Sequence, residues 1–404
     1  MRQELPIMIA VASCGALVAL GEPVTIALLR RAAALDVPNG RSSHTIATPR
    51  GGGAPIALGL VLVAAAVRSP AVIAFAFAVA AFSAIGLADD LAGLPAVRRL
   101  LLQGAASFAA ALALLSQLGM SPSGLTLVGL SPPSLAPVGL AAAAAVLAIW
   151  ITGFVNAFNF MDGVNGISGA HAALAGLVYA FLGAWRPDVF LVAGGGAVAA
   201  GALAFLPWNA GRARVFLGDV GSYGLGAALA VLAACAVIAG IPVEAAGAPL
   251  ALYLADTAWT LQRRIRAGER CFEAHRSHTY QQLCDLGWSH QRVTAATGGC
   301  TVLLCLLGSA SLAGNAALRA AADAVALGVL AVYLRAPVLL GQPGQRAKLA
   351  RRAAVPAQPA MAYPAGTVSA VTTVSAVTTV PAVTAVSAVT TAQPAEPAQR
   401  LEHA

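Results

Sequence analysis

The chain has 404 residues, of which 59% are hydrophobic and only 10% are charged, and its formal net charge is +8. An average soluble domain carries about a quarter of charged residues, so this composition excludes an ordinary soluble protein and indicates a multi-spanning membrane protein. The positive charge does not indicate nucleic-acid binding, because the sequence contains no basic soluble domain that would carry such a surface.

Long apolar runs predict an all-α, polytopic bundle of transmembrane helices. One span takes about 17 to 25 residues. In chain order, we expect about eleven spans, at 5–29, 51–68, 70–88, 98–117, 137–155, 167–185, 188–206, 220–240, 243–262, 293–313 and 317–335. The first run lacks a basic segment before it and continues at full spanning length, so we expect a retained first helix and no cleaved signal peptide.

The distribution of arginine predicts the orientation of these helices. With the N-terminus outside, most Arg residues fall in the inner connections, and the outer ones hold only Arg2, Arg68, Arg186 and Arg319. Basic residues concentrate in cytoplasmic connections. We therefore expect the N-terminus outside and both the C-terminus and the catalytic loops in the cytoplasm.

The composition changes near the C-terminal end. From about residue 355 the chain is a short imperfect repeat of Ala, Val, Thr and Pro, a composition typical of disorder. We expect a membrane domain at 1–340 and a basic, then low-complexity, disordered cytoplasmic tail at 341–404.

Unusual polar residues gather in the predicted inner connections. These are DVPNGRSSHTIATPRGGG (36–53), GLADDLAG (86–93), NAFNFMDGVNG (156–166), WNAGRARVFLGDVGSYG (208–224) and RRIRAGERCFEAHRSHTYQQLCDLGWSH (263–290). Together they bring carboxylates, amides, histidines, arginines and glycine-rich turns to one membrane face. Such a set is typical of a metal-assisted site that acts on a phosphate.

Acidic residues at the ends of two predicted spans are candidates for this site. Asp89 and Asp90 end the third span, where a helix C-terminus disfavours negative charge. The pair therefore requires a compensating cation, and we favour a functional role over a solvated helix end. Asp219, flanked by glycines before a span, is nearly as consistent with a helix cap as with ligand binding.

The motif HRSHTYQQL in the last of these connections carries two histidines, His275 and His278, on either side of Arg276. Two histidines without a third ligand at suitable spacing are a weak indication of zinc. A loop that binds anionic phosphate fits the local charge better.

Five motifs in this order, RSSHTIATPRGGG, GLADD, NAFNFMDGVNG, FLGDVGSYGLG and HRSHTYQQL, resemble the polyprenyl-phosphate N-acetylhexosamine-1-phosphate transferases. That family includes the phospho-N-acetylmuramoyl-pentapeptide transferase and the enzymes that begin O-antigen and N-glycan assembly. The resemblance covers roughly residues 1–340. It implies transfer of a sugar 1-phosphate from a UDP-sugar to a polyprenyl phosphate, with release of UMP and with magnesium, or alternatively manganese, as the cofactor.

The resemblance also implies catalytic and metal-binding roles by motif position. Asn159 and Asp219 match the magnesium ligands, and Asp89 matches the proposed base that deprotonates the lipid phosphate. Asp90 and Asp162 match neighbouring acidic positions. Magnesium is chemically reasonable, because one or two protein oxygens together with substrate phosphates suffice for its coordination. Direct attack and an aspartyl-phosphate intermediate are both compatible with these residues, and we favour direct attack.

Substrate-binding roles follow from the same resemblance. Asn165 and Phe216 match positions that contact uracil, the second by stacking. One family motif is a loop that closes over the diphosphate and sugar, and it is matched by His275, Arg276 and His278. Another is a glycine motif beside the nucleotide and lipid phosphate, and it is matched by Gly51, Gly52 and Gly53.

The motifs further indicate a branch of the family. HRSHTYQQL stands where the pentapeptide transferase carries a run of histidines, and together with LDVPNGRSSHT it resembles the O-antigen initiating branch. We expect a UDP-N-acetylhexosamine or 6-deoxy donor, an undecaprenyl phosphate acceptor and a place in the bacterial inner membrane. Peptidoglycan-type lipid I synthesis is the alternative, and homodimer formation is left open.

A secondary transporter is the main alternative from another class, since polar residues and broken helices also line transport paths. Against it, the polar groups cluster at one face. The exceptions are Glu22 beside Pro23, which also fits a kinked helix, and Asp256, which also fits pairing with Arg263 and Arg264. A purely structural scaffold is disfavoured, because it would gain nothing from so many polar groups near lipid.

Overall fold

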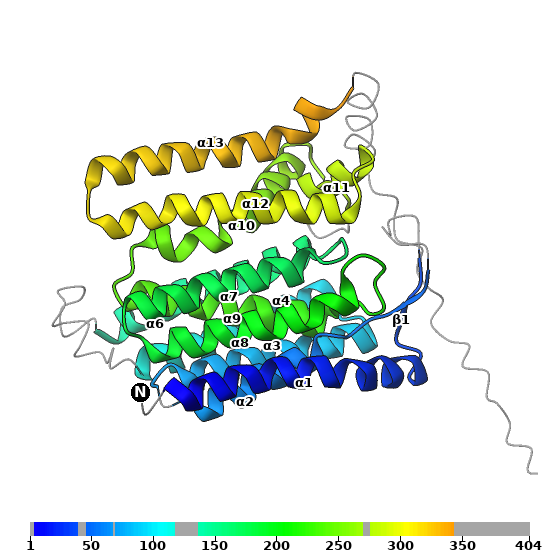
Figure 1. Cartoon of the computed structure of the whole chain (residues 1–404), viewed down its shortest axis with the longest axis horizontal. Coiled ribbons are helices and arrows are strands. Elements are labelled where there is room, and N and C mark those ends of the chain that lie inside the picture. The colour runs from blue at the N-terminus through cyan, green and yellow to red at the C-terminus, as the bar shows by residue number, and fades with distance from the viewer. Residues whose placement is uncertain (1–3, 39–45, 68, 118–135, 270–274, 343–404) are drawn as a thin grey trace, which may run out of the picture. The chain divides into compact units, whose positions relative to one another are not determined.

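The computed structural model describes residues 4–38, 46–67, 69–117, 136–269 and 275–342, and these residues form an α-helical bundle (Figure 1). Its α-helices are α1 (Glu4–Arg31), α2 (Ala54–Ala66), α3 (Val72–Ala92), α4 (Ala96–Gln117), α6 (Ala136–Met161), α7 (Ile167–Trp185), α8 (Val189–Asn209), α9 (Gly218–Ile238), α10 (Val243–Arg266), α11 (Thr279–Asp285), α12 (His290–Ser309) and α13 (Ala316–Leu340). The all-α prediction is confirmed. Nearly all of the predicted tail lies outside the described residues, so the domain division stays a prediction.

Each of the eleven predicted segments coincides with a helix, but two of these helices do not meet the requirements for a span. Among the described residues, nine helices are long and apolar enough to cross a membrane. α2 has 13 residues and is about 20 Å long, short of a hydrocarbon core of about 30 Å. α10 carries Arg263, Arg264 and Arg266 in its last turn. By length and composition, eleven complete spans is therefore an overestimate.

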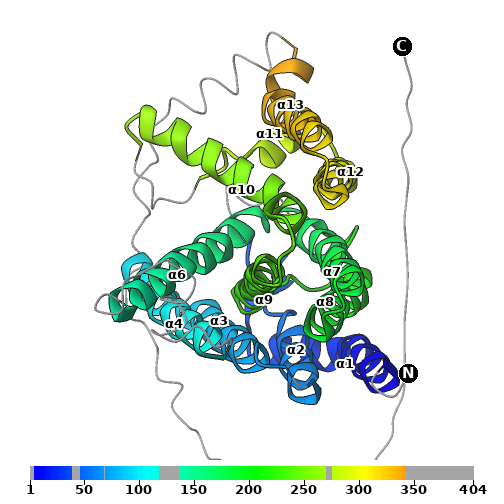
Figure 2. The same ribbon diagram turned by 90° about the vertical axis from the view of Figure 1, so that its left-hand side faces the viewer.

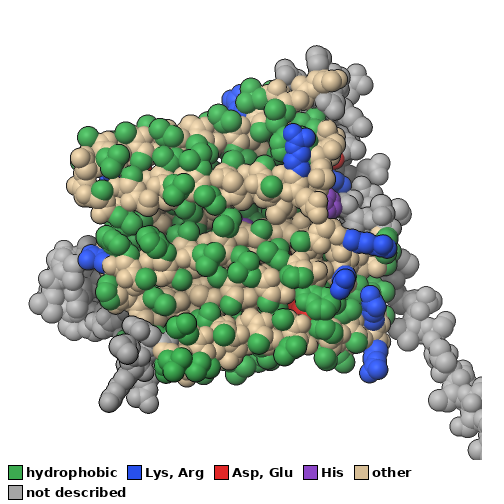
Figure 3. Space-filling model, in the orientation of Figure 1, with side chains coloured by type: hydrophobic (Ala, Val, Ile, Leu, Met, Phe, Trp, Pro, Cys, Tyr) green, Lys and Arg blue, Asp and Glu red, His purple; other side chains and the backbone are tan. Residues whose placement is uncertain are grey.

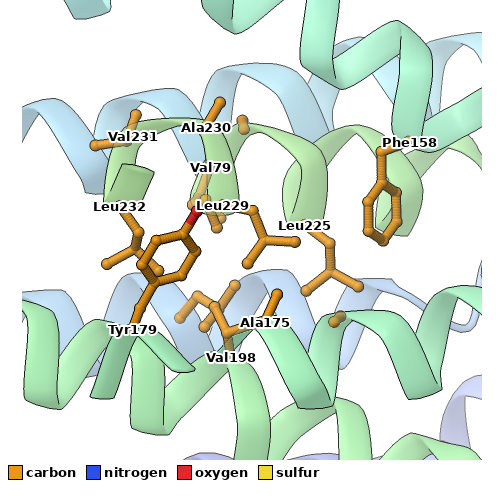
Figure 4. Close-up of a cluster of buried hydrophobic side chains, with 14 of the residues drawn as sticks. Val79, Phe158, Ala175, Tyr179, Val198, Leu225, Leu229, Ala230, Val231 and Leu232 are labelled. Carbon is orange, nitrogen blue, oxygen red and sulfur yellow. The ribbon is translucent and has the colours of Figure 1, made fainter. Parts of the chain in front are cut away.

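The central element of the bundle is α9, which α3, α6, α7 and α8 surround (Figure 2). Every residue of α9 from Gly218 to Ala236 is buried. Side chains from the surrounding helices, among them Val79, Phe158 and Tyr179, pack around its leucines (Figure 4). A helix that is apolar on every side is typical of such a buried position.

Two glycines let neighbouring elements approach the backbone of α9. A Cβ atom on Gly86 in α3 would lie 2.1 Å from the carbonyl oxygen of Asp219, and one on Gly53 would lie 2.0 Å from the Cα atom of Gly221. No side chain fits at these separations. The contact at Gly86 therefore brings the C-terminal end of α3, with its aspartate pair, directly to the N-terminal end of α9.

A short strand pair, which was not predicted, leads the connection between α1 and α2 toward the same place. β1 (Leu35–Asp36) and β2 (Thr48–Pro49) pair antiparallel. Directly after β2, Arg50 forms a parallel bridge with Phe216, whose backbone N–H donates to the carbonyl of Pro49 at 2.8 Å. This pairing holds Arg50 beside the residues that precede α9.

The polar connections lie together at one end of the bundle. Lys and Arg side chains gather at the end that carries β1 and α11 in Figure 1, and apolar side chains cover most of the length of the helices (Figure 3). The prediction that the polar connections share one face is confirmed. That this face is the cytoplasmic one stays a prediction.

The contact at Gly86 can be tested by a pair of glycine substitutions. Gly86→Ala should lower the free energy of unfolding by about 1–3 kcal/mol, the usual range for overpacking, because the methyl group would meet the α9 backbone. Gly104→Ala in α4 is the matched control, since no atom lies within 4 Å of its Cβ position. Thermal unfolding in detergent measures both, and an equal effect of the two changes would contradict the packing.

Candidate active site

Asp90 joins the end of α3 to the beginning of α9. Its Oδ1 and Oδ2 accept hydrogen bonds from the backbone N–H groups of Asp219 and Val220, each at 2.9 Å. The first N–H groups of a helix lack partners within the helix and carry partial positive charge. The buried carboxylate of Asp90 therefore satisfies these groups and fixes the start of α9 relative to α3.

Arg50 supplies a compensating cation of the kind that we expected for the aspartate pair. Its Nε lies 2.7 Å from Oδ1 of Asp90, and its Nη2 lies 2.7 Å from Oδ2 of Asp219. Burial alone would lower the pKa of Arg50, but the negative charges of Asp219 and Asp90 outweigh it and raise the pKa above its usual value. One guanidinium thus bridges carboxylates on two helices.

Asp89 has a separate set of partners. Its Oδ2 accepts from Nη1 of Arg99 at 3.1 Å and from the hydroxyl of Tyr223 at 2.9 Å, and its Oδ1 accepts from the backbone N–H of Leu94 at 2.8 Å. Consecutive residues on a helix point about 100° apart. The two aspartates therefore face different surroundings, Asp90 toward the start of α9 and Asp89 toward the start of α4.

The first two asparagines of NAFNFMDGVNG have different positions. Nδ2 of Asn159 donates to Oδ1 of Asp219 at 2.8 Å and to the hydroxyl oxygen of Ser222 at 3.0 Å. Nδ2 of Asn156 instead donates to Oε1 of Gln103 in α4 at 2.7 Å, an interhelical contact of the kind that holds membrane helices together. Asn159 and Asp219 thus meet, and their role as magnesium ligands stays a prediction.

The donor atoms around Asp219 fit magnesium better than a metal that is bound entirely by protein. No group of three or more His, Cys, Asp or Glu residues with metal-binding geometry occurs in the described part of the chain. Magnesium needs only one or two carboxylates and takes its remaining ligands from water and phosphate. Because Arg50 already neutralises Asp219, a divalent cation would replace that ion pair.

Asp162 lies next to this cluster, immediately after α6. Its backbone N–H donates to the carbonyl of Asn159 at 3.1 Å. Burial and the negative charges of Asp219 and Asp90 together raise the pKa of its carboxyl to about 6, against the effects of Ser168 and Arg50, which lower it. Asp162 therefore belongs to the same electrostatic site.

The predicted uracil contacts, Asn165 and Phe216, both support the connection between α8 and α9. Nδ2 of Asn165 donates to the carbonyl of Gly211 at 2.7 Å. The carbonyl of Phe216 accepts from the N–H groups of Gly51 and Gly52 at 3.1 and 2.9 Å. These contacts are structural, and the uracil-binding roles stay predictions.

The glycine motif packs tightly against this connection. A Cβ atom on Gly52 would lie 2.8 Å from Cγ2 of Val215, and Gly51 has a φ angle of +124°. Gly53 approaches Gly221 as described above. The three glycines are thus explained by close packing, and their predicted contact with the nucleotide and lipid phosphate is untested.

The loop after α10 reaches the site through α11. The hydroxyl of Tyr280 donates to the carbonyl of Phe160 at 2.9 Å, next to Asn159. Nη2 of Arg276 lies 3.6 Å from Oδ1 of Asp285. Burial, the neighbouring His278 and the positive charges of Arg264 and Arg263 lower the pKa of His275 to about 3, so this histidine is neutral near pH 7.

His278 is buried and not exposed in the loop, and its Nδ1 lies 3.3 Å from Oδ1 of Asp256. The direct hydrogen bonds of Asp256 include residues of α11 and α13, while its charge also acts on Arg263. Nothing in the sequence indicated the contact between Asp256 and His278, because the two residues are 22 positions apart.

Sequence reasoning missed several polar residues that the structure brings to the site. These are Arg50, Arg99, Ser222, Tyr223 and Tyr280. One signal was available for Tyr223, which follows Asp219 by four residues and so lies on the same face of α9. Arg50 and Arg99 were interpreted only as markers of topology.

Comparison with known proteins places the chain in a family. The model of the family described as "Glycosyl transferase family 4" matches residues 72–237. A decaprenyl-phosphate N-acetylglucosaminephosphotransferase from Mycobacterium tuberculosis is 30% identical over 305 residues, which cover 66% of this chain and 72% of the relative. The chain belongs to glycosyl transferase family 4.

Other members of family 4 agree with this result. A protein of the same name from Mycobacterium leprae is 31% identical over 66% of this chain and 74% of its own length. A phospho-N-acetylmuramoyl-pentapeptide-transferase from Symbiobacterium thermophilum is 33% identical over 43% of this chain and 52% of its own length. The predicted resemblance is confirmed, and the chain is a multi-pass membrane transferase and not a secondary transporter.

The raised pKa of Asp162 predicts a dependence of stability on pH. Because the folded pKa of about 6 lies above the ordinary value of 3.8, the folded protein binds more protons between these values. The contribution of Asp162 thus favours folding below about pH 4 and is lost as the pH rises through about 6. Asp162→Asn should remove this loss of stability. The free energy of unfolding of the variant should therefore exceed that of wild type by ~1–3 kcal/mol between pH 4 and 7. Thermal unfolding at several pH values measures it, and a pH-independent difference would contradict the shift.

Proposed function

We propose that this protein transfers N-acetylhexosamine 1-phosphate from a UDP-sugar to a polyprenyl phosphate and releases UMP, at the cytoplasmic face of a bacterial inner membrane. The observation that carries the proposal is the meeting of Asp89, Asp90, Asn159 and Asp219 with two arginines at one end of the bundle. The names of the mycobacterial relatives favour N-acetylglucosamine as the sugar. O-antigen synthesis remains our proposal for the pathway.

Asp89 and Arg99 are suited to receive the acceptor phosphate. They form an ion pair at 3.1 Å at the start of α4, where a lipid phosphate arriving from the bilayer would meet both a base and a cation. Asp89 takes the remaining proton of the phosphate monoester, whose second pKa is near 6. A lipid phosphate oxygen then attacks the β-phosphorus of the UDP-sugar. The bond from this phosphorus to the bridging oxygen breaks, and UMP leaves with that oxygen.

Asp219 and Asn159 are the residues that would hold magnesium. When bound, the ion neutralises charge on the diphosphate and on the departing UMP. If a metal ion took the place of Arg50 beside Asp219, Arg50 would be available to pair with a phosphate oxygen. Arg276 is the cation that the loop before α11 contributes to the same end of the bundle.

A single assay tests this function. Membranes containing the protein are incubated with undecaprenyl or decaprenyl phosphate and one radiolabelled donor, either UDP-N-acetylglucosamine, UDP-N-acetylgalactosamine or UDP-N-acetylmuramoyl-pentapeptide. We expect organic-extractable label and equimolar UMP with an N-acetylhexosamine donor. Product with the pentapeptide donor alone would instead support lipid I synthesis, and no product with any donor would contradict the proposal.

The metal assignment predicts the effect of a change at Asp219. Asp219→Asn should lower turnover at least ~100-fold, because it removes a charged metal ligand that no neighbour replaces. Asp188→Asn is the matched control, since Asp188 caps α8 outside this cluster and asparagine caps a helix equally well. Turnover of wild type should stop in excess EDTA and return with magnesium. Undiminished turnover in EDTA would refute the metal.

The different surroundings of the aspartate pair predict different pH profiles. Asp89→Asn should lower kcat by about 10²- to 10⁴-fold, the range for a general base, and the defect should lessen above pH 6–7, where the phosphate loses its proton unaided. Asp90→Asn should show no such recovery above pH 6–7, because Asp90 holds the start of α9. pH–rate profiles at saturating donor measure both. If the two losses are equal and flat, the pair acts only electrostatically, and Asp162 becomes the candidate base.

A further inference from the structure

Asp256 is a fully buried carboxylate in the middle of α10, outside the cluster described above. Its Oδ1 accepts from the backbone N–H of Thr279 at 3.0 Å and from the hydroxyl of Thr260 at 3.2 Å. Its Oδ2 accepts from the hydroxyl of Tyr333 in α13 at 2.9 Å. Asp256 therefore joins three helices, α10, α11 and α13.

This acid is not explained by a simple charge balance. A buried carboxylate in a membrane bundle is costly and usually functional. The nearest arginines of α10 have other partners, since Nε of Arg264 lies 2.8 Å from Oε2 of Glu269 and Arg263 donates to the carbonyl of Ser277. The remaining partner of Asp256 is the imidazole of His278, whose Nδ1 lies 3.3 Å from Oδ1.

The surroundings of Asp256 determine which nitrogen of His278 carries a proton. The backbone N–H of Thr279 can only donate, and the two hydroxyl groups donate as well, so the carboxylate acts as an acceptor. Nδ1 of His278 therefore carries the proton in this pair. Nε2, on the far side of the ring, is buried and has no hydrogen-bond partner in the described part of the chain.

The ring of His278 lies beside the motif that contributes Asn159. Its centroid is 6.1 Å from that of Phe160, 5.0 Å from that of His275 and 5.8 Å from that of Tyr280. Buried polar atoms nearly always have a partner. An unpartnered nitrogen at this place therefore indicates a partner that arrives with the substrate.

We propose that Asp256 is a positioning residue of the transferase, which holds His278 with its proton on Nδ1 and thereby presents Nε2 to the sugar of the donor. When the ring carries only the proton on Nδ1, Nε2 accepts a hydrogen bond and fits a hydroxyl or acetamido N–H of the sugar. The inference rests on the proposed function for the identity of the substrate. It gives α13, through Tyr333, an indirect part in donor recognition.

A double-mutant cycle tests the coupling between the two residues. Asp256→Asn and His278→Gln should each lower kcat/KM for the UDP-N-acetylhexosamine by about 10- to 100-fold, as is usual for groups that orient a site residue. The double variant should lie within about twofold of His278→Gln alone. Thr260→Val is the matched control, because Thr260 touches the same carboxylate but not His278, and it should change kcat/KM by less than about threefold. Fully additive losses would overturn the proposal.

A spectroscopic measurement tests the same point without any turnover. In the protein labelled with ¹⁵N-histidine, the signal that disappears in His278→Gln belongs to His278, and its nitrogen shifts report the tautomer. We expect the proton on Nδ1 in wild type and a mixture of tautomers in Asp256→Asn, with gel filtration and thermal unfolding as checks of folding. A proton on Nε2 in wild type would overturn the proposal even if Asp256→Asn fails to fold. Absence of product with every donor would instead count against the proposed function and leave this result intact.

Discussion

The structure depends on the binding of one buried carboxylate to the start of a buried helix. Asp90 satisfies the first N–H groups of α9, and Arg50 joins Asp90 to Asp219 within that same first turn. In a low-dielectric interior, unpaired N–H groups and unpaired charges are both costly. The arrangement is therefore stable only when α3, α9 and the connection after β2 are all in place.

This arrangement explains how chemistry is possible at the end of an otherwise apolar bundle. The polar groups form two sets that share the junction of α3 and α9. Asp89 with Arg99 faces the start of α4, and Asp219 with Asn159 faces the end of α6. Two sets of charges, held side by side by Asp90 and Arg50, suit a reaction that brings two phosphates together while keeping the roles of acceptor and donor separate.

The part of the chain that follows α9 has a different character. The family match ends at residue 237, before α10, α11 and the loop between them. This part contributes through long-range contacts, with Tyr280 bound to Phe160 and Asp256 bound to His278. Members of the family act on different sugars, as the names of the relatives indicate. A segment that reaches the common site through such contacts is a suitable place for donor choice.

The sequence by itself determined which segments are helical and which residues are candidates for catalysis. Lipid admits only backbone that satisfies its own hydrogen bonds, so every long apolar run had to be a helix. For that reason the eleven helical segments could be predicted, whereas the meeting of Asp219 with Asn159 was implied by the family resemblance. The family resemblance was equally accessible, since it depends on the order of short motifs.

Only the tertiary structure decided the partners of these residues. Arg50 reaches Asp219 across 169 positions of sequence because glycines at 53 and 86 let backbones touch, and no local pattern encodes such an approach. The same holds for Asp256, which local reasoning paired with arginines one or two turns away, whereas packing of α11 between α10 and α13 gave it His278 and Tyr333. Helix formation depends on neighbours along the chain, but the choice of an ion-pair partner depends on which helices pack together.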